Sequence, residues 1–572
     1  MRKQLLVILA LMLACVASWA QPLNIGGHRA VKDIRNGIWL CSIPQSQFGT
    51  DYSATVSYGD SISQLTIDGV EVPSGAVYNF ASVEGSKNYA LSFILNDEEV
   101  TGNITFTWLP IVELNGNFGY DYQYGDVIVN EPDSAYGEPM MAKLKWRGTV
   151  TNVSGKHKRN YRIKFVNSED STKENHRFFG LRNDNSWILD AGQMDFLRVR
   201  NRVGTDLWLD MARRPWYSDT LPNARNGSRG QMVEVVLNNR YAGIYNMCEP
   251  IDRKQLKLKR YDDINDEVRG ALWQAYVWSR TVTMSRPKPR GSETSEWDGF
   301  EMKYPSFNEI GYANWWPLED AVYFSGNGNM DPQLRIDSLN YYFDVPVMQD
   351  YYILISVLQA LDNESLNIFY ACYNQQDNPR LTLVPWDLDI TLGQSYDPKF
   401  DLPNMVKPER HPREWIGGVP LLVMEDLYHS EIIDRYLELR ENVLSTESLI
   451  NRYRTAVEEL ENCGAAAREE DRWSGDSDLA GKNLDLSAEM DYVEDWIRRH
   501  MTYLDERVFN HNPIIVIKGD VNNDREVNIM DVDCVISVIL GGLDTYEGRA
   551  DVNGDGEVNI LDVDNIISII LQ

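Results

Sequence analysis

The spacing of apolar residues changes along this 572-residue chain, and each spacing predicts a different kind of structure. Between residues 21 and 139, short runs alternate apolar and polar side chains, and Gly, Asn, Asp and Pro separate the runs. A period of two is typical of β-strands that bury one face. The pattern therefore predicts a β-rich N-terminal domain, a small β-sandwich, over residues 21–139.

Residues 140–510 mix both periods and predict an α+β domain. Residues 142–165 are typical of two strands joined by a turn. From residue 421 the chain is largely helical, and over residues 486–509 apolar residues recur at helical spacing, which predicts a helix that packs on a core. The residues of this stripe are Met490, Val493, Trp496, Ile497, Met501 and Leu504.

The domain is organised around residues 344–393. An apolar helical run begins near Val347, with Asp344 as its predicted cap, and ends near Asp362. Residues 368–373 and 380–386 then predict two strands of a hairpin, because a turn rich in Asn, Gln, Asp and Pro separates them. The start of the first strand lies beside the end of the second, so Asn367 and Asp387 should meet near Asp362.

These three residues suit phosphoryl transfer. A D-x-x-x-x-N segment offers a carboxylate that orients a substrate hydroxyl and an amide oxygen for a metal, and a later Asp bridges Mg²⁺ to phosphate. This assigns Asp362 as the catalytic residue, with Asn367 and Asp387 as metal ligands. Asp389 faces the same side of an extended chain as Asp387 and is a further candidate ligand. Because the chain is rich in Asp and Asn, the D-x-x-x-x-N segment alone is weak evidence for a phosphoryl-transfer site. Its pairing with P-W-D-L-D across the hairpin is what supports the prediction.

Several longer motifs resemble the spore-coat-protein-H (CotH) kinase family, secreted atypical kinases that are distantly similar to protein kinases. The resemblance covers residues 142–509 and implies an atypical kinase-like domain that uses ATP and Mg²⁺ to phosphorylate a protein hydroxyl. The motifs are K-W-R-G at 145–148, K-R-N-Y-R-I-K-F at 158–165, L-R-V-R-N at 197–201, V-E-V-V-L-N-N-R-Y-A-G-I-Y-N-M-C-E-P at 233–250, F-D-V-P-V-M-Q-D-Y-Y at 343–352 and P-W-D-L-D-I-T-L-G at 385–393. One departure is the second Asn of L-N-N-R-Y, where the family usually has Gly.

The resemblance also suggests which cations hold the nucleotide phosphates. Lys164 is the first choice and Lys158 the second, because the family's hairpin offers both, and Lys303 is a third candidate. Glu249 is expected to pair with Lys164, as in the kinase Lys–Glu pair. The alternatives are an exposed strand face for either lysine and a salt bridge at a domain edge for Glu249.

The first 20 residues predict a signal peptide, since Arg2 and Lys3 precede an apolar core that ends before Ala20. A Leu-Ala-Cys sequence that ends at Cys15 leaves a lipoprotein as the alternative. The apolar run is too short to span a membrane, and no later segment is apolar enough. The protein is therefore expected to be secreted or held at the cell surface. The five cysteines after residue 20 are too widely spaced to predict a disulfide scaffold or a zinc site.

The tail, residues 514–572, contains the same twelve-residue Asp/Asn loop twice, 31 residues apart. Oxygen ligands at loop positions 1, 3, 5, 9 and 12, with a carbonyl at position 7, can surround Ca²⁺. The first loop supplies Asp520, Asn522, Asp524, Glu526, Asn528 and Asp531, and the second supplies Asp551, Asn553, Asp555, Glu557, Asn559 and Asp562. A helix is expected after each loop, over residues 532–540 and 563–571. The tail resembles a dockerin, a small all-α domain with two F-hand calcium loops that docks onto cohesin modules.

The net charge of the chain bears on its possible partners. The net charge of −30 and the pI of about 4.7 argue against a nucleic-acid partner. The favoured function is a secreted atypical kinase tethered to an extracellular assembly, although ATP is scarce outside the cell. The alternative is a non-catalytic binding or structural component of an extracellular polysaccharide-degrading complex. A glycosidase is a third option, but no pair of carboxylates in the sequence fixes such a site.

Overall fold

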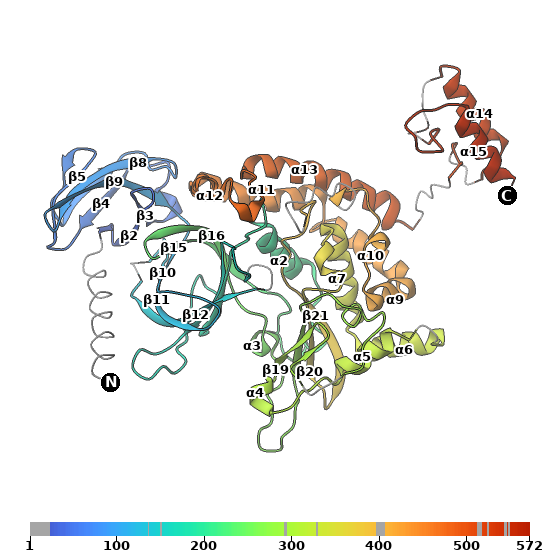
Figure 1. The fold of residues 1–572 in the computed structure, drawn as a ribbon, viewed down its shortest axis with the longest axis horizontal. Coiled ribbons are helices and arrows are strands. Elements are labelled where there is room, and N and C mark those ends of the chain that lie inside the picture. Colours follow the sequence, from blue (N-terminus) through green and yellow to red (C-terminus); the bar gives the residue numbers. More distant parts are fainter. Residues whose placement is uncertain are drawn as a thin grey trace. The chain divides into compact units, whose positions relative to one another are not determined.

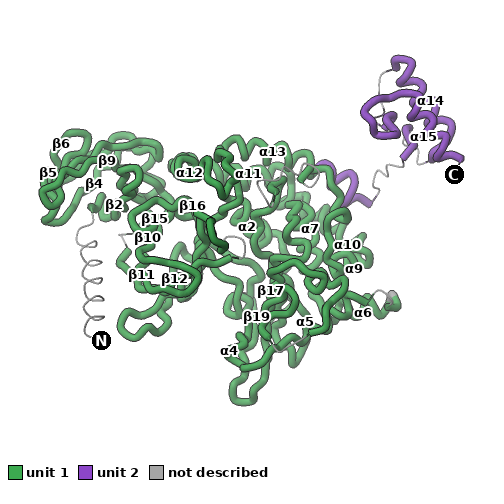
Figure 2. Tube along the Cα trace, viewed as in Figure 1, with its two compact units in different colours: residues 1–501 green, residues 502–572 purple. Residues whose placement is uncertain are grey.

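The computed structural model describes residues 23–571, apart from residues 135–136, 149–151, 291–293, 328–329, 396–405, 512–517, 523–525, 543–545 and 547–548. The predicted signal peptide lies outside the described residues. The chain divides into two compact units, residues 1–501 and residues 502–572 (Figure 2). Among the described helices, none has the length and apolar character needed to cross a membrane.

The N-terminal part is β-rich, as predicted. Its nine strands form one continuous sheet in the order β6-β5-β8-β9-β3-β2-β1-β4-β7 (Figure 1). The alternating apolar side chains enclose one core, in which Trp39, Phe80 and Phe106 are buried. The strands are β1 (Asn24–Ile25), β2 (His28–Asp33), β3 (Ile38–Ser42), β4 (Tyr52–Ser57), β5 (Ile62–Ile67), β6 (Val70–Glu71), β7 (Ala76–Phe80), β8 (Asn88–Leu95) and β9 (Glu98–Thr107).

A closed barrel follows, in the order β10-β11-β12-β13-β14-β16-β15. Its strands are β10 (Ile111–Asn115), β11 (Gln123–Asn130), β12 (Met140–Arg147), β13 (Asn160–Phe165), β14 (Ser186–Asp190), β15 (Gly230–Leu237) and β16 (Arg240–Cys248). Strands β10 and β11 lie before the predicted boundary at residue 139, and they belong to the barrel and not to the N-terminal sheet. Strand β10 closes the barrel by pairing in parallel with β15, where Ile111 lies opposite Glu234.

A second, five-stranded sheet has the order β18-β19-β17-β20-β21, with strands β17 (Ala271–Ala275), β18 (Glu296–Trp297), β19 (Phe300–Tyr304), β20 (Ile368–Asn374) and β21 (Asn378–Pro385). The predicted hairpin is confirmed, since β20 and β21 pair antiparallel with Ile368 opposite Pro385. The described helices up to residue 503 are α2 (Arg200–Met211), α3 (Arg253–Leu256), α4 (Phe307–Ile310), α5 (Leu318–Ser325), α6 (Pro332–Tyr342), α7 (Val345–Leu358), α9 (Val419–Leu427), α10 (His429–Arg440), α11 (Thr446–Asn462), α12 (Ala465–Trp473) and α13 (Leu486–Tyr503). Helices α6 and α7 pack on β21, and α12 packs on barrel strand β16.

Helix α7 begins where predicted, but Asp344 does not cap it with its side chain. The carboxylate of Asp344 instead accepts a hydrogen bond from the backbone N–H of Trp216 (2.9 Å). Burial raises the pKa of Asp344 to about 6. Helix α13 buries its predicted apolar stripe, including Met490 and Trp496.

In the C-terminal unit, α14 (Ile529–Ile539) and α15 (Ile560–Ile570) pack against each other around Val535 and Ile566. Both helices begin three residues earlier than predicted. The reason is that Asn528 and Asn559 act as N-caps, each with a reciprocal capping box.

Candidate functional site

Four carboxylates converge on one cavity of about 330 Å³. Asp190 is the last residue of β14, Asp362 lies in the turn Leu361–Asn363 after α7, and Asp387 and Asp389 follow β21. The other lining residues include Arg147, Gly148, Asn160, Gln193 and Asn367. We call this cavity the acidic pocket.

The β20–β21 hairpin places Asp362, Asn367 and Asp387 at the same end, as the sequence pattern predicts. The backbone N–H of Trp386 donates to the carbonyl of Asn367 (2.9 Å), and the Asn363 side chain donates to the carbonyl of Trp386 (2.8 Å). The Asn367 amide donates to Asp362 Oδ2 (3.2 Å) and so orients that carboxylate. The geometry is in place, while the chemical roles stay predictions.

Two of these residues adopt a backbone conformation that is unfavourable for residues other than glycine. Asn367 has a φ of 53° and Asp387 a φ of 61°. Non-glycine residues in this left-handed region are uncommon, and such strain concentrates at functional sites. The hairpin hydrogen bonds hold both residues in place.

Asp190 was missed by the sequence analysis. Asn201, in the first turn of α2, donates to Asp190 Oδ2 (2.6 Å) and accepts from the backbone N–H of Leu388 (3.0 Å). One amide thus ties the end of β14 to the P-W-D-L-D segment. The available signal was W-I-L-D at 187–190, an apolar strand that ends in Asp, as β21 leads into Asp387.

The carboxylates of the acidic pocket repel one another in a buried setting. Burial, together with the charges of Asp190 and Asp362, raises the pKa of Asp387 to about 7, although the charge of Arg147 opposes this shift. The pKa of Asp389 is raised well above its usual value by burial and by Asp387. Burial also raises the pKa of Asp362. A divalent cation removes such repulsion, and carboxylate and amide oxygens are the ligands that Mg²⁺ prefers, so the donor set fits this ion.

Lys158 lines neither this pocket nor the basic pocket described below, and its role as a phosphate ligand stays a prediction. Its Nζ donates to Glu469 Oε1 (2.6 Å) and to the carbonyl of Ile244 (2.8 Å), and the side chain is buried. Arg198 Nε also donates to Glu469 Oε1 (2.6 Å). Burial lowers the pKa of Lys158 to about 7, although Glu469 opposes this shift. The residue therefore belongs to a buried ion cluster between the barrel and α12.

Glu249 does not pair with Lys164. Its carboxylate accepts from the Arg229 guanidinium (2.7 Å) and from the backbone N–H of Arg182 (3.0 Å). The alternative from the sequence, a salt bridge, is what the structure shows at this residue.

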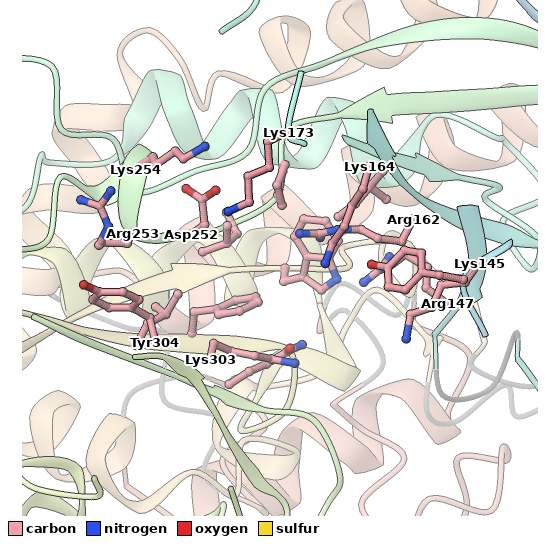
Figure 3. A pocket seen from close by; sticks show the side chains of 18 residues that line it. Lys145, Arg147, Arg162, Lys164, Lys173, Asp252, Arg253, Lys254, Lys303 and Tyr304 are labelled. Carbon is pink, nitrogen blue, oxygen red and sulfur yellow. The ribbon is translucent and has the colours of Figure 1, made fainter. Parts of the chain in front are cut away.

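Lys164 lies instead in a second, basic pocket of about 550 Å³ (Figure 3). Lys145, Arg147 and Arg162 line it beside Lys164, from β12 and β13, and Lys303 comes from β19. The cations at the remaining positions are Lys173, Arg253 and Lys254. Arg147 lines both pockets, so the basic pocket adjoins the acidic pocket there.

Comparison with known proteins decides the family. Residues 144–504, more than half of the chain, match the family model described as CotH kinase protein. The chain belongs to the CotH kinase family. This confirms the resemblance inferred from the motifs, and the matched region of this CotH family member begins inside the barrel, in β12, and ends directly after α13. Residues 518–571 match the dockerin type I domain, which confirms the resemblance of the tail.

Other comparisons add little. No curated protein matches the chain. Among solved structures, the crystal structure of the I9–I11 tandem from titin is 14% identical, with a TM-score of 0.09. The match spans 25% of this chain and 61% of the titin chain, and a TM-score this low supports no conclusion about fold.

The loops of the dockerin domain fold around their acidic residues. Asp551 accepts from the backbone N–H groups of Gly554 (2.8 Å), Asp555 (3.2 Å) and Gly556 (2.9 Å). In the first loop, Asp531 Oδ1 accepts from the backbone N–H groups of Val521 and Asn522. The oxygen-rich loops fit Ca²⁺. Predicted ligand Asp524 lies outside the described residues.

The side chains at position 9 of the two calcium loops make hydrogen bonds within the protein. Asn528 Oδ1 accepts from the Met530 N–H (2.8 Å), and Asn559 Oδ1 accepts from the Leu561 N–H (2.9 Å). These side chains cap helices, whereas the sequence analysis counted them as direct ligands. In such loops position 9 often reaches the ion through water.

Calcium removal should destabilise the dockerin domain selectively. We expect a chelator to lower the melting temperature of residues 518–571 and leave the larger unit unchanged, because the ion neutralises carboxylates that otherwise repel one another. Calcium at a hundred times its dissociation constant should stabilise the domain by about 2.7 kcal/mol. Calorimetric scans of the full chain with Ca²⁺ or chelator measure both transitions. Identical scans in the two conditions would contradict the assignment.

Proposed function

We propose that this CotH family member is a secreted atypical kinase that transfers phosphate from ATP to a protein hydroxyl in a Mg²⁺-dependent reaction. The observation that carries the proposal is the continuity of the two pockets at Arg147. Phosphoryl transfer needs cations along the phosphates and a metal-binding cluster at the reacting phosphate, and the two pockets supply them side by side.

The residues of the acidic pocket have different proposed roles. Asp362, held by the Asn367 amide, orients the acceptor hydroxyl and receives its proton. Asp387, with Asn367 and Asp389, would hold Mg²⁺, and Asp190, which lines the same pocket, would contribute a further oxygen. When bound, the metal supplies positive charge to the phosphoryl oxygens. Because little covalent chemistry is required of the protein, positioning and charge account for the rate.

The basic pocket would hold the nucleotide. Apolar surface for a base comes from four further lining residues, Ile188, Ile251, Leu272 and Phe369. Arg147 adjoins the acidic pocket and would contact the phosphates nearest the transferred group, while Lys164 lies farther along β13.

Nucleotide titration of the purified protein tests the proposal. We expect ATP to bind in the presence of Mg²⁺ and to bind weakly or not at all without it, as calorimetry can measure. Absence of Mg²⁺-dependent nucleotide binding would overturn the kinase assignment.

Lys164 provides a more local test. Lys164→Met should weaken ATP binding about 10-fold, since loss of one close charge costs roughly 1–1.5 kcal/mol in a half-buried site. Lys482→Met is the matched control, because Lys482 is exposed and lines neither pocket. Equal affinities in both variants and the wild type would remove Lys164 from the nucleotide site.

The dockerin domain supports the rest of the proposal and one alternative. Through calcium-ordered loops it would attach the protein to a cohesin-type module of an extracellular or cell-surface assembly, after export by the predicted signal peptide. The alternative is a non-catalytic binding or structural component of a polysaccharide-degrading complex. A protein that binds a cohesin but no nucleotide would favour that alternative.

A further inference from the structure

The outer face of the β12–β13 hairpin is a ladder of cations. Lys143 lies directly opposite Lys164, and Lys145 lies opposite Arg162. Arg147 occupies the next outward position of β12. Like charges that face each other across two strands destabilise a sheet. Because all five of these outward positions carry positive charge, a bound anion would relieve their mutual repulsion.

Aromatic rings, and not carboxylates, accompany this ladder. Lys164 and Lys145 lie 4.7 and 5.1 Å from the centre of the Tyr122 ring. Within the described part of the chain, neither lysine has a carboxylate oxygen within 4 Å, and the same holds for Arg162 and Lys173. Burial lowers the pKa of Lys164, and the charges of Arg162 and Lys143 lower it further. The cations of β12 and β13 are half-buried, so solvent only partly compensates their repulsion.

Positive charge continues across the pocket. Figure 3 shows the cations distributed from Arg147 and Lys145, at one end of the view, to Arg253 and Lys254 at the other. Lys254 pairs with Asp184 and Lys303 with Glu301. Asp252 is the acidic residue among the 18 that line the pocket, and it is bound by Arg182 (2.8 Å).

The cations extend over a longer part of the basic pocket than the phosphates of one nucleotide require. The phosphates of ATP lie at one end of the molecule, and its ribose and base carry no charge for the cations at the other end. A chain of phosphates carries negative charge along its whole length. It also ends in a phosphoanhydride of the kind that the acidic pocket is proposed to cleave.

We propose that the basic pocket binds linear inorganic polyphosphate, and that the polyphosphate chain serves as a second phosphoryl donor beside ATP. The proposal rests on the proposed kinase function. In the transfer, the terminal P–O–P bond breaks and a P–O bond forms to the acceptor hydroxyl. The hydroxyl proton passes to Asp362, and the leaving chain is one phosphate shorter and keeps the electron pair of the broken bond.

Binding gives the first test, with the full-length protein, Mg²⁺ and ATP, tripolyphosphate or polyphosphate of about 15 units. We expect affinity to rise at least 10-fold from tripolyphosphate to the longer chain, because the longer chain reaches the far cations. The double variant Lys173→Gln/Arg253→Gln should lose most of this gain, and Lys482→Gln should keep it. A chain-length-independent affinity would overturn the proposal.

Transfer gives the second test. With polyphosphate labelled at its terminal phosphate, we expect label to appear in a serine-rich model protein such as casein, while the chain shortens by one unit. If ATP supports labelling and polyphosphate does not, the donor inference fails and the kinase function stands. If neither donor labels protein, both fail. Tight polyphosphate binding that only inhibits transfer from ATP would mark the pocket as a site for an anionic acceptor, and would overturn the donor role.

Discussion

Replacing Asp387 by Asn is expected to weaken Mg²⁺-dependent nucleotide binding strongly and to slow phosphate transfer with it. The residue is buried among Asp190, Asp362 and Asp389, and this setting raises its pKa to about 7 despite the charge of Arg147, so a bound cation would stabilise its charged form. Loss of one ligand to the charge-stabilising metal should lower turnover about 10²–10³-fold. The change is nearly isosteric and removes a buried charge, so the folded domain should melt at the same temperature or higher. Titration with Mg²⁺-ATP and thermal unfolding measure both effects.

Asp362→Asn is the matched comparison and should fail differently. It removes the group that receives the acceptor proton, so turnover should fall about 10²–10⁴-fold. Nucleotide affinity should survive, because Asp362 is not proposed to hold the metal. Equal loss of nucleotide binding in the Asp362 and Asp387 variants would place Asp362 among the metal ligands and contradict its catalytic role.

Glu469→Gln is expected to be the most destabilising single change in the larger unit. It would leave Lys158 and Arg198 buried together without a negative charge. Removing one member of a buried ion cluster costs about 3–5 kcal/mol, a large share of the 5–15 kcal/mol by which domains are stable. Denaturant unfolding followed by tryptophan fluorescence measures the loss.

Lys158→Met provides the internal control. Glu469 would keep Arg198 and the backbone N–H of Ile244 (2.7 Å) as partners, so the loss should be clearly smaller. If the Lys158 variant is instead fully stable but loses ATP binding, the nucleotide role inferred from the family resemblance would be supported.

The parts of the site that are local in sequence were predictable. The alternation over residues 368–386 and its polar turn determine the β20–β21 hairpin, which in turn brings Asn367 to Asp387. The repeated Asp/Asn loop identified the dockerin domain for the same reason. Asp362 was found because it lies five residues before Asn367.

The parts that depend on distant contacts were not predictable. Glu469 meets Lys158 across 311 residues, so no spacing rule linked them, and the lysine was assigned to the nucleotide instead. Asp190 reaches the acidic pocket only because β14 is a strand of the barrel. The place of β10 in the barrel was not predicted for a similar reason, since β10 pairs in parallel with a strand more than 100 residues away.

The left-handed backbone at Asn367 and Asp387 has a consequence for laboratory evolution. Glycine adopts this conformation without strain, so Asn367→Gly and Asp387→Gly would relieve the backbone, and the second would also remove a buried charge. A library screened only for heat resistance should therefore accumulate glycine at these two positions. The selected variants would be heat-stable proteins that lack the proposed metal ligands. Selection for stability alone would therefore yield variants of this fold without the proposed activity.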